Sequence, residues 1–132
     1  MAQTNARNLK KLITLQKLGA ARLEALLAVT SNRKTVLDEE RNALIAMQDR
    51  RYDGDAFSVD PSLLIKRLGA NALATEQIEQ QLESERRGLL KEQRRVELLE
   101  DRLETVRNAA ESRELASLIE EFVSRKTSVS YG

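Results

Sequence analysis

The sequence predicts an all-α protein, a long antiparallel two-helix coiled-coil hairpin whose second helix continues past the first as a C-terminal overhang. Apolar residues recur about every 3.5 positions in two long stretches, and one short turn-forming segment separates them. A third of the 132 residues are charged, while aromatic residues make up only 3%. This composition is typical of long helices and not of a globular core, so we expect one rod-like coiled-coil domain over residues 1–132.

The first helix is expected from about residue 5 to residue 52. Seven of its twelve heptad positions are apolar, and three further apolar residues, Ile13, Ala20 and Leu27, widen the stripe. Residues 30–34 form a weak centre, and a bend or fraying of the helix there is left open. The a positions are Leu9, Gln16, Leu23, Thr30, Leu37 and Leu44, and the d positions are Leu12, Gly19, Leu26, Arg33, Glu40 and Met47.

Residues 53–60 are expected to form the connecting loop. Asp53, Gly54 and Asp55 are typical turn residues, because glycine accepts positive φ and aspartate side chains bond to nearby backbone groups. Asp60 followed by Pro61 predicts a helix start, with Asp60 as the N-cap and Pro61 at the first helical position.

The second helix is expected from about residue 61 to residue 126, followed by a loose tail over 127–132. Eight of its twelve heptad positions are apolar, and a kink near Gly69 is left open. The a positions are Thr75, Leu82, Leu89, Val96, Leu103 and Ala110, and the d positions are Ile78, Glu85, Glu92, Leu99, Val106 and Arg113.

A short connection between two long helices favours antiparallel pairing. With Arg51 opposite Ser62, position i of the first helix faces about 113 − i of the second. Leu23 then lies near Leu89 and Leu90. Arg33 and Lys34 then come near Glu79 and Glu83.

The same pairing leaves the end of the second helix uncovered, because the first helix runs out opposite about residue 108 while the helical pattern continues to Lys126. Five apolar residues in that overhang share one helix face, which we name the C-terminal stripe and predict as a partner-binding site. They are Leu115, Leu118, Ile119, Phe122 and Val123. Packing of this stripe on the N-terminal residues is the alternative.

Charge is unevenly distributed along the chain, although the net charge is only +1. Residues 1–35 contain seven basic side chains and one acidic, and Arg7, Lys10 and Lys11 belong to this basic face. No aromatic residue interleaves these cations, which argues against a nucleic-acid site. A solvated face and a protein partner are the main interpretations, and an anionic membrane surface is a third.

The chain contains no cysteine and no histidine, so thiol chemistry and histidine catalysis are excluded. It also lacks the glycine-rich phosphate-binding motifs, and the acidic run at Asp53 lacks the ligand spacing of an EF-hand. We therefore predict no catalytic, cofactor-binding or metal-binding residue and no enzyme activity. No apolar run approaches a membrane span, which predicts a cytoplasmic protein without membrane insertion.

Several short segments of the chain together resemble the central-stalk family of type III secretion, of the FliJ/YscO kind. The segments are Leu9-x-x-Leu12, Tyr52 before the Gly54 loop, Leu99-Glu100-Asp101-Arg102-Leu103, Glu114-Leu115, and Glu120-Glu121-Phe122 with Arg125-Lys126. Flagellar members commonly end in a more polar Asp- and Glu-containing sequence than Phe122-Val123. A flagellar and a virulence-type system therefore both stay open.

The resemblance implies a stalk similar to the rotary ATPase γ subunit. Such a stalk is a monomer that binds a hexameric export ATPase and an export gate protein, couples ATP hydrolysis to export and, in some members, escorts secretion chaperones. It implies gate contacts at Ile45, Gln48 and Tyr52, and a cytoplasmic location peripheral to a membrane-bound secretion apparatus. The alternatives are a secretion chaperone or adaptor, and a generic coiled-coil scaffold that dimerises through its seams.

Overall fold

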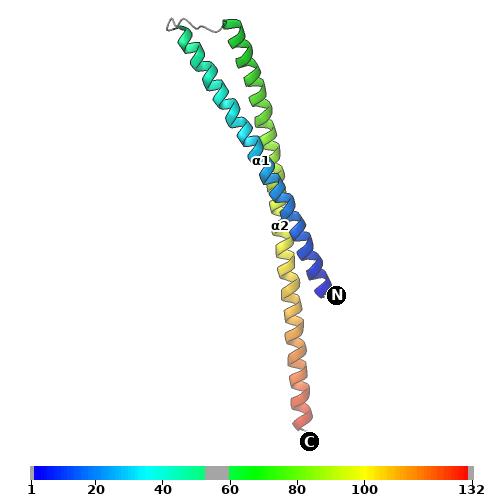
Figure 1. The fold of residues 1–132 in the computed structure, drawn as a ribbon. Coiled ribbons are helices and arrows are strands. Elements are labelled where there is room, and N and C mark those ends of the chain that lie inside the picture. Colours follow the sequence, from blue (N-terminus) through cyan, green and yellow to red (C-terminus); the bar gives the residue numbers. More distant parts are fainter. Residues whose placement is uncertain (1, 53–59, 131–132) are drawn as a thin grey trace. The chain divides into compact units, whose positions relative to one another are not determined.

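The structure, a computed structural model, describes residues 2–52 and 60–130, and the side chains of residues 4–50 and 60–127. It contains two helices, α1 (Ala2–Tyr52) and α2 (Pro61–Ser130), and no strand among the described residues (Figure 1). The all-α fold of two long helices packed against each other is therefore confirmed. The predicted loop over residues 53–59 lies outside the described residues.

Both helices are longer than the sequence predicted. α1 begins at Ala2 instead of near residue 5, and α2 continues to Ser130, so the expected loose tail over 127–130 is wrong. Residues 127–130 contain no glycine or proline to end the helix. The Thr127 hydroxyl also donates to the Val123 carbonyl oxygen at 2.7 Å, which is compatible with helical backbone.

Asp60 caps the start of α2 as predicted. Its Oδ1 accepts a hydrogen bond from the Ser62 N–H at 3.1 Å, and its carbonyl oxygen lies 3.1 Å from the N–H groups of both Leu63 and Leu64. Pro61 occupies the first helical position, where its missing N–H leaves no bond unmade. From this cap α2 continues without interruption through Gly69.

The chain divides into two compact units, each containing a segment of both helices. Unit 1 holds the described residues up to Gly19 together with those from Glu92 onward, and unit 2 holds Ala20–Lys91. We describe each unit separately. In both, the α1 segment (blue to cyan in Figure 1) packs on an α2 segment.

Contacts across unit 2 establish its antiparallel register. Lys34 Nζ lies 3.8 Å from Glu79 Oε1, which confirms one predicted ion pair. The other pairing is wrong, since Glu83 instead pairs with Arg87 one turn along α2. In unit 1, Lys17 Nζ lies 3.1 Å from Glu100 Oε1.

The predicted seam of α2 is confirmed for every position except Arg113, which is exposed. The seam also extends back towards the cap. Its buried or half-buried residues are Leu64, Leu68, Asn71, Thr75, Ile78, Leu82, Glu85, Leu89, Glu92, Val96, Leu99, Leu103, Val106 and Ala110. Leu90, which we expected beside Leu23, is 65% exposed.

The prediction of the α1 seam is correct for one of its two lines of residues. All the predicted a positions are buried or half-buried, but of the d positions only Gly19 is, while the other five are exposed. The second line of the seam lies one residue further along and consists of Ala6, Ile13, Ala20, Leu27 and Lys34. Both lines are about equally apolar. The predicted line contains two charged residues, Arg33 and Glu40. The actual line contains one charged residue, Lys34, whose long side chain reaches Glu79.

Polar layers interrupt the apolar seam of unit 2. Thr30 is 1% exposed, and its hydroxyl donates to Glu85 Oε1 at 3.0 Å, while Gln81 Nε2 donates to the same oxygen at 3.0 Å. Asn71 Nδ2 donates to the Leu37 carbonyl oxygen at 2.9 Å. A shift of register separates Thr30 from Glu85 and leaves this buried carboxylate without its donor from α1, so the Thr30–Glu85 layer favours one pairing of the two helices.

Among the described residues, the buried apolar side chains are few: Ile13, Leu44, Leu64, Leu82 and Leu103. Most seam residues are only half-buried, as expected where two helices cover each other on one side. Within the described residues, neither helix contains a stretch that is long and apolar enough to cross a membrane.

Leu82→Ala should lower the free energy of unfolding by about 2–5 kcal/mol, because it leaves a cavity at a buried position that is only 4% exposed. Leu90→Ala is the matched control on the exposed side of α2 and should change that free energy by less than about 0.5 kcal/mol. Urea denaturation followed by circular dichroism measures both values. Equal effects of the two substitutions would contradict the seam.

Thr30→Val should lower the free energy of unfolding by about 1–3 kcal/mol, because Glu85 loses a buried hydrogen-bond donor. Thr30→Val combined with Glu85→Leu should recover most of that loss, since two apolar side chains then replace the pair. Urea denaturation measures the free energy of unfolding of the single and the double variant. If Thr30→Val alone has no effect, the hydrogen bond does not contribute to stability.

Candidate interaction surfaces

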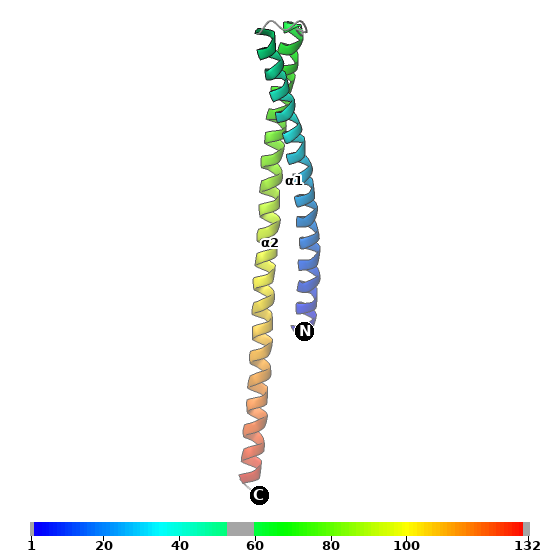
Figure 2. The same cartoon turned by 60° about the vertical axis from the view of Figure 1, so that its left-hand side comes forward.

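The C-terminal stripe lies on the part of α2 that has no α1 residue against it. Figure 2 shows the orange and red end of α2 continuing past the N-terminal end of α1, and all described side chains from residue 111 to 127 are exposed. Each residue of the stripe is more than half exposed, and Phe122 is 66% exposed. Lys126 Nζ lies 5.9 Å from the centroid of the Phe122 ring, at the outer limit of a cation–π contact.

The stripe is not a continuation of the intrachain seam. The seam line of α2 becomes polar beyond Ala110, at Arg113, Ser117 and Glu120. At 100° per residue, the stripe therefore lies on another side of α2. Since the two apolar lines face different directions, the stripe is available to a partner that does not displace α1.

The basic residues Arg7, Lys10 and Lys11 line a shallow hollow of about 480 Å³ on α1, together with Thr14 and Leu15. All three basic side chains are exposed. Among the described residues, no carboxylate lies within ion-pair distance of them. The hollow is thus a positively charged surface with an apolar edge, which suits an acidic protein surface.

The residues that the resemblance assigns to the export gate lie near the end of α1. Ile45 is 38% exposed and Gln48 is exposed, and their three-residue spacing places them on one side of the helix. Tyr52 is the last residue of α1, but its side chain lies outside the described residues. The structure therefore brings Ile45 and Gln48 together and adds nothing on Tyr52.

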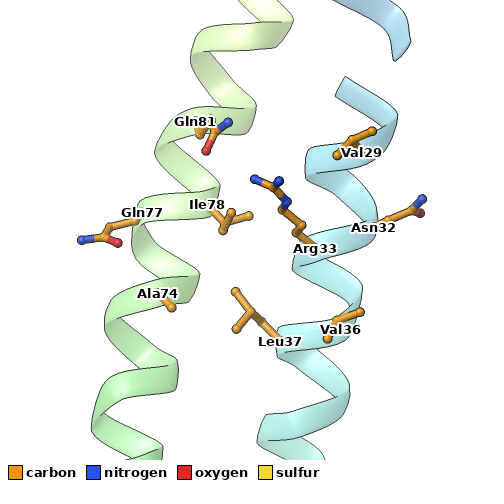
Figure 3. A pocket seen from close by; sticks show the side chains of 9 residues that line it. All are labelled: Val29, Asn32, Arg33, Val36, Leu37, Ala74, Gln77, Ile78 and Gln81. Atoms are coloured by element: carbon orange, nitrogen blue, oxygen red, sulfur yellow. The ribbon is translucent and has the colours of Figure 1, made fainter. Parts of the chain in front are cut away.

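The sequence prediction missed one surface, a groove of about 630 Å³ between α1 and α2 of unit 2. Figure 3 shows Arg33, Leu37 and Ile78 pointing into the space between the two helices. The groove is lined by Val29, Asn32, Arg33, Val36 and Leu37 of α1 and by Ala74, Gln77, Ile78 and Gln81 of α2. It was missed because Arg33 was assigned to the seam as a defect. Its exposed charge within an apolar line was the available signal.

Comparison with protein families, with curated proteins and with solved structures finds no match to this chain. The resemblance to type III secretion stalks therefore stays a prediction that rests on the short segments quoted above. Within the described residues, no group of three acidic side chains is placed to hold a metal ion.

Proposed function

We propose that this chain is a non-enzymatic coupling protein, the central stalk of a flagellar or virulence-type III export apparatus. It binds the hexameric export ATPase and the export gate protein from the cytoplasm, peripheral to the membrane-bound apparatus. The observation that carries the proposal is the exposed C-terminal stripe, because a continuous apolar face on a highly charged helix is typical of a surface that a partner covers.

The stripe supports attachment to the ATPase in a helix-in-groove manner. Its residues follow the spacing with which amphipathic helices anchor in apolar grooves. Phe122 is the largest of these side chains, and large aromatic side chains tend to dominate such interfaces. We therefore expect Phe122 to contribute more to binding than the other residues of the stripe.

The basic hollow supports a second, electrostatic contact with the same or another protein partner, such as a secretion chaperone. Arg7, Lys10 and Lys11 are exposed and have no acidic partner among the described residues. Unpaired surface charges of one sign accelerate association with an oppositely charged surface. Ile45 and Gln48, with Tyr52, are the proposed contact with the export gate.

A secretion chaperone or adaptor is the second candidate, because the same stripe suits an apolar segment of an unfolded export substrate. The exposure of all five stripe residues favours this function as much as attachment to a folded ATPase. The two candidates differ in the partner: an adaptor binds an unfolded client in a 1:1 or 2:1 complex, whereas a stalk binds the folded hexamer.

Phe122→Ala should weaken binding to the export ATPase by about 2 kcal/mol or more if it is the main anchor. Truncation after Arg113 should abolish most of the binding and the stimulation of ATP hydrolysis. Titration calorimetry with the purified hexamer measures both variants, and Ser112→Ala, on the same exposed segment but with a small side chain, is the matched control.

Circular dichroism separates loss of binding from loss of folding in these variants. Both should keep the helicity of their remaining residues, because the stripe is exposed and surface substitutions change stability little. Tight ATPase binding by the truncated chain would exclude the stripe as the attachment. Unfolding of the truncated chain would place the stripe in the intrachain core.

Lys10→Glu combined with Lys11→Glu should slow association with an acidic protein partner and reduce its salt dependence. Lys66→Glu combined with Arg67→Glu makes the same change of charge on α2 and should leave association nearly unchanged. Stopped-flow association at several salt concentrations measures both pairs. Tight, sequence-independent binding of DNA that weakens steeply with salt would instead assign the hollow to nucleic acid.

A further inference from the structure

A second apolar line runs along α1 in unit 2, beside the seam but outside it. Its residues follow alternating three- and four-residue spacing, as in a coiled-coil seam, and all of them are exposed. We name it the outer stripe: Leu26, Val29, Arg33, Val36, Glu40, Ala43 and Met47. Part of it forms the α1 wall of the groove shown in Figure 3.

The order of residues in the outer stripe is nearly symmetric about Val36. Apolar residues lie at matching distances on either side: Val29 and Ala43 are each seven residues away, and Leu26 and Met47 are ten and eleven residues away. The charges are opposite in sign at matching distances, since Arg33 lies three residues before Val36 and Glu40 lies four residues after it. A difference of one residue is only about 1.5 Å along a helix.

We propose that the outer stripe binds a second copy of this chain, with the two α1 helices antiparallel and related by a two-fold axis beside Val36. A two-fold interface uses the same patch on both copies, so the patch must be complementary to itself when reversed. The outer stripe meets this condition. Each apolar residue meets an apolar residue of the other copy, and each Arg33 lies within a turn of Glu40 of the other copy.

The charges of the outer stripe select the antiparallel arrangement over the parallel one. In a parallel pair in register, Arg33 would face Arg33 and Glu40 would face Glu40, and like charges across an interface oppose pairing. In the antiparallel pair, both charges find an opposite charge at two symmetric positions. Among the described residues, neither Arg33 nor Glu40 has an ion-pair partner within its own chain.

The α2 wall of the groove permits this approach. Ala74, Gln77 and Gln81 are uncharged, so Arg33 is the only charged side chain that lines the groove. Ala74 is small and allows a neighbouring helix to approach closely. The Arg33 guanidinium has no carboxylate partner among the described residues of its own chain, and Glu40 of the second copy supplies one.

This pairing does not depend on the proposed export function, because the outer stripe shares no residue with the C-terminal stripe or the basic hollow. It also differs from a scaffold that dimerises through its seams, since each chain keeps its own seam closed. It replaces the monomer that the stalk resemblance implies with a dimer of the free chain.

A disulfide at the proposed axis tests the geometry, because the chain contains no cysteine of its own. Val36→Cys places the two introduced thiols across the axis and should give mostly disulfide-linked dimer on mild oxidation of the full chain. Thr35→Cys is the matched control, since it is also exposed but points away from the outer stripe. It should give less than about a tenth as much dimer. Equal crosslinking of the two variants would overturn the proposal.

Charge reversal tests the pairing of Arg33 with Glu40. The full chain should show twice the chain mass of 14.9 kDa in light scattering. Arg33→Glu should weaken the dimer at least about tenfold, and Arg33→Glu combined with Glu40→Arg should restore it, because the reversed charges again pair across the axis. Circular dichroism confirms that each variant stays helical.

Two results would overturn the proposal. The first is a monomer mass for the unmodified chain at concentrations up to about 1 mM, the weak end of specific association. The second is a dimer whose stability is unchanged by Arg33→Glu, or is not restored by the second reversal. The first result would mean that the chain does not self-associate. The second would mean that a dimer forms through a surface other than the outer stripe.

Discussion

The hydrogen bond between Thr30 and Glu85 determines which residues of α1 and α2 face each other in unit 2. A purely apolar seam is tolerant of sliding by a heptad, because one leucine layer resembles the next. The buried carboxylate of Glu85 is specific, since sliding one helix along the other removes its hydrogen bond from Thr30 and leaves it only the bond from Gln81 of its own helix. The ion pair between Lys34 and Glu79 follows from the same register, and so does the position of Arg33 at the groove.

Much of this fold could be predicted from the sequence because long, strongly periodic helices carry their own signals. The cap at Asp60, the seam of α2 and the approximate register were all predicted correctly. The second line of the α1 seam was not, because positions three and four residues after each a position are about equally apolar in this stretch. The partner helix decides between them, and a single helix sequence does not contain that information.

The candidate surfaces were predictable to different degrees. The C-terminal stripe followed from length alone, since α2 outlasts α1, and the structure leaves it exposed. The groove was not predicted from the sequence, because Arg33 and Glu40 were placed at d positions of the α1 seam, where they are two charged residues in an apolar line. Once the seam is moved by one residue, the same two charges become parts of an exposed surface. A charge at an expected core position thus indicated an error in the assigned face.

The rigid screw geometry of α2 has a consequence for how this chain tolerates changes of length. One residue inserted between Ala110 and Leu115 turns the C-terminal stripe by about 100° around the helix axis and advances it by about 1.5 Å. Seven inserted residues advance it by about 10.5 Å while changing its direction by only about 20°. Insertions and deletions here are therefore expected to be tolerated in heptads. Such steps change the reach of the stripe from the seam and preserve the side on which a partner meets it.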